Sequence, residues 1–231
     1  MKNIPIVILN KDRVTPLKLL VEALRRRNYN NIIIIDNEST YAPLLEWYNT
    51  SEINVFYNNI PKTLYDTGTF YRLAYELGHP QFVDIVKDFY VFTDSDVIPE
   101  DDTPTDFIDH MVELCGELNS HKIGLGLRVD NLPETSYTNS VREIESQYWM
   151  NKIIHNGFEL YQAPIDTTFA VYHPNTKPIW GHGFRMGGSY VAKHMPWYYD
   201  INNLPEDELY YLKNLKPNRG PTYSMQVKKS I

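Results

Sequence analysis

Residues 32–35, four consecutive isoleucines, limit the possible folds of this chain more than any other stretch. A strand with one face in water alternates apolar and polar side chains, whereas this run is apolar on both faces. Such runs are typical of parallel strands that helices cover on both sides. Further strands are expected at residues 4–9, 53–57 and 89–93, with helices between them at residues 15–27, 42–49 and 66–77. This strand–helix order predicts an α/β fold with a Rossmann-like, mostly parallel central sheet and helices on both faces.

The second half of the chain is less regular. Helices are expected at residues 103–118, 140–154 and 205–214, and strands at residues 122–129 and on both sides of Pro164. Gly124 and Gly126 indicate that other groups approach the backbone closely within residues 122–129. Residues 181–189 contain four glycines and are expected to form a flexible loop.

Composition and charge place the chain among ordinary globular proteins. Its 231 residues, 42% of them hydrophobic and 22% charged, suit one large domain with a substantial core. A net charge of −7 argues against nucleic acid as the main partner, because binding to its backbone needs an excess of Lys and Arg. We expect no transmembrane segment and no signal peptide, since the apolar runs are only of strand length. Cys115 is the single cysteine, so no intrachain disulfide can form, which fits a cytoplasmic protein.

Three polar clusters follow predicted strands of the first half, at residues 10–13, 36–40 and 94–96. The carboxyl ends of parallel strands lie at one edge of the sheet, and ligands of such folds bind there. In the third cluster Asp94 and Asp96 lie one residue apart, so both would point to one face if the strand continued. Two such carboxylates suit a divalent cation, but Asp and Ser are also common in turns. Taken alone, this cluster leaves a metal site and an ordinary turn equally open.

Four segments, in this order, resemble glycosyltransferase family 2-like enzymes of the GT-A fold. The first is IVILNKDR at residues 6–13, the opening strand and turn, and the second is IIDNEST at residues 34–40, an apolar strand followed by Asp-Asn-x-Ser. The third is VFTDSD at residues 91–96, which contains the Asp-x-Asp motif of the family. A looser match is YVAKHMPWY at residues 190–198, similar to a late His-x-Pro-Trp-Tyr segment. The matches span about residues 4–215, nearly the whole chain.

The resemblance implies a transferase that takes a sugar from a nucleoside diphosphate sugar, usually a UDP-sugar, and passes it to a hydroxyl of a glycan or similar acceptor. It also implies Mn²⁺ or Mg²⁺ as cofactor, because a divalent ion neutralises the leaving diphosphate. In one domain of residues 1–231, residues 1–100 would bind the donor and residues 101–231 the acceptor. By position, the base pocket would be lined by Leu9, Asn10 and Arg13, the base or ribose held by Asp36, the donor contacted by Asp94 and Ser95, and the metal bound by Asp94, Asp96 and His194.

An inverting reaction, which the resemblance also implies, needs a base for the acceptor hydroxyl. The candidate carboxylates on the acceptor half are Asp130, Glu143, Glu145 and Asp166. We predict Asp166, because it lies in a polar break between apolar stretches. Candidates for added positive charge at the diphosphate are Arg72 and Arg185. His182 competes with His194 as the late metal ligand, and a single histidine taken alone is more often an ordinary packed or surface residue.

Three other functions stay open at this point. An apolar strand followed by Asp-x-Asp also begins haloacid dehalogenase-like phosphohydrolases, in which Asp94 would be the nucleophile, but that motif normally lies on the first strand of its domain. A nucleotidyltransferase has a similar nucleotide-binding sheet, but usually a glycine-rich basic loop after its first strand, and residues 10–13 contain no glycine. A binding module that has lost the chemistry is the third, and the intact Asp-x-Asp argues weakly against it.

Overall fold

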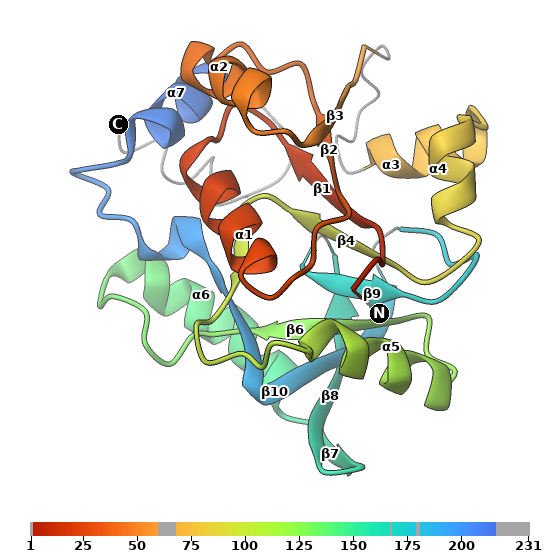
Figure 1. Ribbon diagram of the computed structural model, residues 1–231. Coiled ribbons are helices and arrows are strands. Elements are labelled where there is room, and N and C mark those ends of the chain that lie inside the picture. The colour runs from red at the N-terminus through yellow and green to blue at the C-terminus, as the bar shows by residue number, and fades with distance from the viewer. Residues whose placement is uncertain (1, 60–67, 167, 179–180, 216–231) are drawn as a thin grey trace.

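The computed structural model describes residues 2–59, 68–166, 168–178 and 181–215 (Figure 1). These residues form one mixed sheet of ten strands, in which β5 pairs off the main path. The strands are β1 (Ile6–Asn10), β2 (Ile32–Asp36), β3 (Asn54–Tyr57), β4 (Tyr90–Asp94), β5 (Val97–Pro99), β6 (Lys122–Leu127), β7 (Lys152–His155), β8 (Phe158–Ile165), β9 (Ala170–Tyr172) and β10 (Gly181–His194). The helices are α1 (Thr15–Arg25), α2 (Ala42–Thr50), α3 (Thr69–Tyr71), α4 (Pro80–Ile85), α5 (Phe107–Glu117), α6 (Ser136–Ser146) and α7 (Glu206–Asn214), with a π-helical segment at Arg72–Glu76 and 3₁₀ turns at Gln147–Trp149 and Met195–Tyr198.

The strand order β3-β2-β1-β4-β9-β6-β10-β8-β7 divides into two parts. β3, β2, β1 and β4 run parallel, as the strand–helix alternation predicted. β9 then lies antiparallel between β4 and β6, and β10 runs parallel to β6 but antiparallel to β5 and β8. The predicted α/β class is confirmed, with a mixed sheet whose continuous run of parallel strands lies in the first half of the chain.

Helices cover both faces of the sheet, which explains the unbroken apolar runs. Ile6 and Ile8 of β1 belong to the core cluster that includes residues of α1, α2 and α5. Val7 and Leu9 of the same strand belong to the cluster that includes residues of α3 and α4. The isoleucines of β2 divide between the two clusters in the same alternating way. Both strands are therefore apolar on both sides because each side has its own core.

The flexible loop predicted at residues 181–189 is wrong, because these residues begin the 14-residue strand β10. Two of its glycines, Gly183 and Gly187, are needed for close packing. A Cβ atom on Gly183 would lie 2.5 Å from the carbonyl oxygen of Lys122, and one on Gly187 would lie 2.8 Å from the ring of Tyr161. Glycine in a strand often marks such an approach, so here it gives a tightly packed strand.

The helix predicted at residues 140–154 is wrong at both ends. α6 begins earlier, at Ser136, because Thr135 and Thr138 form a capping box in front of it. It ends at Ser146, and after a 3₁₀ turn the chain forms the edge strand β7, which pairs only with β8 in the described sheet. Short amphipathic segments next to a sheet edge can adopt either structure, and the pairing with β8 decides here.

Two other expectations have mixed outcomes. The helix predicted at residues 66–77 includes residues outside the described part of the chain; from residue 68 onward it consists of α3 and the π-helical segment. The close approach predicted at residues 122–129 is confirmed at Gly126, where a Cβ atom would lie 2.3 Å from the ring of Trp149. Within the described ranges, no helix combines the length and the apolar character needed to cross a membrane.

Candidate functional site

The polar ends of the first parallel strands meet at one edge of the sheet. In the register of β1, Asn10 is paired with Asp36 of β2, and Leu9 is paired with Asp94 of β4. The convergence predicted from the strand–helix order is therefore confirmed. α7, from the far end of the chain, lies beside α2 at the same edge (Figure 1).

The Asp-x-Asp motif does not continue as a strand. β4 ends at Asp94, and Ser95 and Asp96 form a turn before β5 begins. The turn is fixed from two sides. The N–H of Ser95 donates to the carbonyl of Leu9 at 3.1 Å, and the N–H of Met195 donates to the carbonyl of Asp96 at 2.8 Å. The condition under which Asp94 and Asp96 would share a face, a strand that continues, is therefore not met.

Asp96 is the centre of a polar cluster. Its side chain is 4% exposed, and its Oδ2 accepts a hydrogen bond from Nη1 of Arg13 at 2.9 Å. Nε2 of His194 lies 3.6 Å from the same oxygen. The other oxygen, Oδ1, is buried and receives no hydrogen bond from any described residue, and the same is true of Nδ1 of His194. Arg13, Asp96 and His194, predicted from separate segments of the sequence, thus come together, and two of their buried polar atoms have no hydrogen-bond partner among the described residues.

The atoms around Asp96 suit a divalent cation in part. A carboxylate oxygen and an imidazole nitrogen are ordinary ligands of transition-metal ions, and buried polar atoms without a partner call for an explanation. In the part of the chain that the structure describes, however, no three His, Cys, Asp or Glu side chains are grouped so as to hold a metal ion. Asp94 does not complete such a group with Asp96 and His194. Metal binding by these three residues stays a prediction.

Arg13 is enclosed by α7. Its Nε and Nη2 donate to Oε2 and Oε1 of Glu208 at 2.6 and 2.9 Å, so the guanidinium binds that carboxylate with two parallel bonds. The ring centroid of Tyr211 lies 3.9 Å from the guanidinium carbon. Burial alone lowers the pKa of Arg13, but the carboxylates of Glu208 and Asp96 hold this pKa well above its usual value. Arg13, expected to line the base pocket, therefore links α7 to Asp96.

The residue next to Glu208, Asp207, closes the N-terminus of α1. Its Oδ2 accepts hydrogen bonds from the N–H groups of Val14 and Thr15 at 2.8 and 2.6 Å, and its Oδ1 accepts one from the Thr15 hydroxyl at 2.9 Å. A carboxylate is favourable here because the first N–H groups of a helix lack partners and carry positive partial charge. Sequence reasoning missed both residues. The acidic start of the helix was visible, but no spacing rule connects Glu208 to Arg13, 195 positions away.

Asp36, expected to hold the base or ribose, lies below the surface of the site at 1% exposure. Its Oδ1 accepts a hydrogen bond from the N–H of Ser39 at 2.8 Å, and its Oδ2 accepts one from the hydroxyl of Tyr48 at 2.9 Å. Nδ2 of Asn10 donates to the same hydroxyl at 2.9 Å. Burial and the Asp36 carboxylate raise the pKa of Tyr48, so its hydroxyl remains a donor. Each oxygen of Asp36 thus accepts one hydrogen bond from within the fold.

On the acceptor half, Asp166 and Glu145 have different surroundings. Asp166 follows β8, is exposed, and accepts a hydrogen bond from the hydroxyl of Thr168 at 3.0 Å. The side chain of Glu145 is only 12% exposed, and its Oε2 accepts a hydrogen bond from Nη1 of Arg185 at 2.7 Å. Burial raises the pKa of Glu145, Arg185 lowers it, Asp166 raises it and His194 lowers it. Asp166 and His194 therefore each lie within electrostatic reach of Glu145.

The remaining candidates from the sequence lie in the π-helical segment, on α6 and on β10. Arg72 forms an ion pair within its own helical segment. Glu143 is exposed on α6. His182 lies near the start of β10, at the opposite end of that strand from His194. Of the two histidines considered as a late ligand, the fold therefore brings His194 to the Asp-x-Asp turn.

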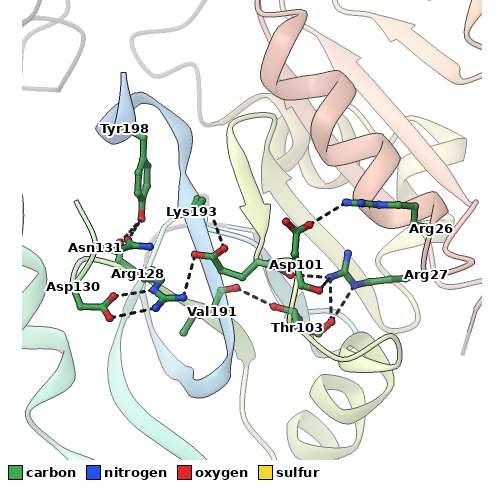
Figure 2. Close-up of polar contacts among 11 residues, drawn as sticks. Arg26, Arg27, Asp101, Thr103, Arg128, Asp130, Asn131, Val191, Lys193 and Tyr198 are labelled. Carbon is green, nitrogen blue, oxygen red and sulfur yellow. Dashed lines mark hydrogen bonds and ion pairs between the residues drawn. The ribbon is translucent and has the colours of Figure 1, made fainter. Parts of the chain in front are cut away.

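A second charged cluster lies where β5, β6 and β10 end (Figure 2). The carboxylate of Glu100 is 7% exposed, forms an ion pair with Nζ of Lys193 at 2.8 Å and lies 3.5 Å from Nη1 of Arg128. Arg128 also pairs with Asp130 at 2.9 Å, which engages that candidate base. The cluster ties the ends of three strands together and so helps to fix His194, the neighbour of Lys193 on β10.

Comparison with known proteins gives only distant structural similarities. No protein-family model matches the chain, and no curated protein matches it. Similar solved structures include S. aureus TarS 1–349, with a TM-score of 0.41 and 11% identity over 74% of this chain and 47% of that one. Another, described as a glucose-1-phosphate thymidylyltransferase from Bacillus anthracis in complex with a sucrose, has a TM-score of 0.36 and 12% identity over 93% of this chain and 76% of that one.

The chain thus spans about half the length of the TarS structure that it matches. At these TM-scores and identities, neither similarity is used to assign the fold or the function of this chain. The fold is established by the strand order and register, and the site by the contacts around Asp96.

Proposed function

We propose that this chain is a sugar-nucleotide enzyme, and more specifically a metal-dependent GT-A glycosyltransferase. It would move a sugar from a nucleoside diphosphate sugar, with UDP-sugars the first candidates, to a hydroxyl of a glycan or similar acceptor. One observation carries the proposal: Asp96 lies buried at the carboxyl end of a parallel strand, with Oδ1 free of hydrogen bonds from described residues and His194 beside it. Ligands of open α/β sheets bind at this edge, and a free carboxylate oxygen there suits a cation that accompanies a diphosphate.

The donor side of the site would be formed by the ends of β1, β2 and β4. Asp96 would hold Mn²⁺ or Mg²⁺, and Asp94 and His194, which are not grouped with it as three metal ligands in this structure, would have to move toward the ion to act as further ligands. When bound, the ion supplies Lewis-acid stabilisation of the leaving diphosphate. Asn10 and Asp36, adjacent in the register of β1 and β2, would hold the nucleoside. The existing hydrogen bond between Tyr48 and Asp36 would then exchange for one to the ligand.

On the acceptor side we propose Asp166 as the base. A bond forms between the acceptor oxygen and the anomeric carbon, the bond from that carbon to the diphosphate oxygen breaks, and the hydroxyl proton passes to the carboxylate of Asp166. The exposure of Asp166 favours contact with an incoming acceptor. Burial raises the pKa of Tyr172, and Asp166 and Asp94 both raise it further, so the two carboxylates act on a common neighbour. Glu145 is the alternative base, and comparing Asp166→Asn with Glu145→Gln in turnover assays separates the two.

The proposal is tested by thermal unfolding with a panel of nucleoside diphosphate sugars, each with and without Mn²⁺. A ligand that binds only the native state raises the melting temperature. Stabilisation by one donor class only in the presence of Mn²⁺ would support the proposal. Stabilisation by phosphomonoesters instead would favour a phosphohydrolase, and a response to a nucleoside triphosphate with a sugar 1-phosphate would favour a nucleotidyltransferase.

A further inference from the structure

We propose that Glu208 is a positioning residue for the metal-binding carboxylate. Acting through Arg13, it fixes Asp96 so that Oδ1 stays available to a divalent cation. This inference rests on the proposed function and deepens it, because it assigns a role to α7, which none of the sequence motifs includes.

The geometry forms a continuous chain of contacts from α7 to the Asp-x-Asp turn. Glu208 binds the Nε and Nη2 edge of Arg13 at 2.6 and 2.9 Å, and Nη1 of Arg13 donates to Oδ2 of Asp96 at 2.9 Å. A guanidinium is planar and rigid, so gripping one edge sets the direction of the remaining N–H groups. The ring of Tyr211 covers its face at 3.9 Å. Asp96 is therefore held by one oxygen, and the other is left without a partner among the described residues.

The charges of Arg13, Asp96 and Glu208 also support a positioning role for Glu208. The side chains of Arg13, Asp96 and Glu208 are 12%, 4% and 1% exposed, so all three charges are largely removed from water. An isolated Arg13–Asp96 pair would be neutral, and the guanidinium would compete with a cation for the Asp96 carboxylate. With Glu208 present, the guanidinium of Arg13 lies between the carboxylates of Asp96 and Glu208. The three groups together then carry one excess negative charge. A buried excess charge is costly until a counter-ion arrives, and that cost favours cation binding at Asp96.

The adjacent residue on the same helix provides a matched control. Asp207 is as deeply buried as Glu208, at 2% and 1% exposure. Like Glu208, it connects α7 to the segment that follows β1. Its hydrogen bonds, however, go to Val14 and Thr15 at the start of α1. If Glu208 served only to dock α7, Asp207→Asn and Glu208→Gln would have similar effects on the site.

The test measures the dissociation constant of Mn²⁺ by electron paramagnetic resonance, with Mn²⁺ as the only added ligand. Loss of a residue that orients a metal ligand typically weakens metal affinity about 10- to 100-fold. We therefore expect Glu208→Gln to bind Mn²⁺ at least about tenfold more weakly than the natural chain, and Asp207→Asn to bind it with unchanged affinity. Circular dichroism checks that each variant is folded. Equal affinities of Glu208→Gln and the natural chain would overturn the inference.

A double-mutant cycle tests whether Glu208 acts through Arg13. In an Arg13→Gln background, Glu208→Gln should cause a clearly smaller further loss of Mn²⁺ affinity than in the natural chain, because the connecting group is gone and only the charge of Glu208 still acts. A full additional loss would mean that Glu208 acts by another route. Should Glu208→Gln fail to fold, Arg13→Lys decides, since a single ammonium cannot grip Glu208 with two bonds and also hold Asp96. Arg13→Lys should weaken Mn²⁺ binding, and unchanged affinity would overturn the inference.

The outcomes separate the inference from the proposed function. If the natural chain binds no Mn²⁺, the metal-dependent function fails and the positioning role fails with it. If the natural chain binds Mn²⁺ and Glu208→Gln binds it equally well, only the positioning role fails.

Discussion

Nη1 of Arg13 donates a hydrogen bond to Oδ2 of Asp96 at 2.9 Å, although 83 residues separate the two in the sequence. The bond joins the turn after β1 to the turn after β4, and Glu208 extends the connection to α7. The edge of the sheet where ligands of this fold class bind is thus assembled from three distant segments. The stability of the fold and the affinity of the site for its ligand should therefore both depend on the contacts of Arg13 with Asp96 and Glu208.

Asp207→Ala should lower the free energy of unfolding. The N–H groups of Val14 and Thr15 lose their acceptor, and removing a helix cap costs about 1–2 kcal/mol. Urea unfolding measures the change. Asp84→Ala serves as the control, because Asp84 pairs with Lys87 on the surface and such pairs contribute less than about 1 kcal/mol. Equal losses in the two variants would show that Asp207 is not a cap.

Gly126→Ala should destabilise the fold by about 1–3 kcal/mol, the usual cost of overpacking a core. The added Cβ would lie 2.3 Å from the ring of Trp149 and 2.4 Å from the backbone oxygen of Met186, and the backbone cannot easily move away. Gly181→Ala is the control, since a Cβ there meets nothing within 4 Å. Thermal and urea unfolding of both variants measure the difference, and a Gly126→Ala protein as stable as Gly181→Ala would contradict the packing.

Lys122 should make stability depend on pH. It is 3% exposed, its Nζ donates to the carbonyl of Ile165, and burial lowers its pKa from 10.5 to about 8. Between these two pH values the unfolded chain keeps a proton that the folded chain has released. The contribution of Lys122 to the free energy of unfolding therefore rises with pH across this window.

The Lys122 contribution is isolated by comparison with Lys122→Met. Urea unfolding at about pH 7.5, 8.5 and 9.5 should show the rise in the natural chain and its absence in the variant. Burial raises the pKa of Cys115 from 9.0 to about 12, which has the opposite effect on stability, but it acts equally in both proteins. Parallel pH profiles for the two proteins would contradict the shifted pKa of Lys122.

His194→Ala should weaken Mn²⁺ binding, because Nε2 of His194 lies 3.6 Å from Oδ2 of Asp96 and its Nδ1 has no partner among the described residues. Loss of one ligand, or of a residue that orients a ligand, typically costs about tenfold or more in metal affinity. His182→Ala, at the other end of β10, should leave the Mn²⁺ titration unchanged. An unaltered titration for His194→Ala would show that His194 is only a packed residue. Its ring centroid lies 4.6 Å from that of Trp197.

The parallel half of the fold and its binding edge were predictable because local patterns determine them. The isoleucine run of β2 requires cover on both faces, and strand–helix alternation then brings Asn10, Asp36 and Asp94 to one edge. The strand β10 was not predictable in the same way. Its glycines suggest mobility when read alone, and only the positions of Lys122 and Tyr161 show why Gly183 and Gly187 are needed.

The site was predictable as a set of residues but not as a set of contacts. Asp96, Arg13 and His194 were selected by motif and order, and the fold joins them. Glu208 could not be found this way, since an acidic helix start has many possible partners and pairing depends on where α7 lies. The turn at Asp96 was one of the two alternatives that the sequence left open, and the shared face of Asp94 and Asp96 fails because β4 ends at Asp94, two residues before Asp96.

The metal-anchored donor site is tested most directly by calorimetric titration of UDP, with and without Mn²⁺, into the natural chain and Asp96→Asn. The asparagine keeps an oxygen for the hydrogen bond from Arg13 but removes the charge that would hold the ion. We predict that the natural chain binds UDP only when Mn²⁺ is present, and that Asp96→Asn, still folded, loses that Mn²⁺-dependent binding. Binding of UDP that is equally tight without Mn²⁺, or unchanged in Asp96→Asn, would contradict the metal site at Asp96.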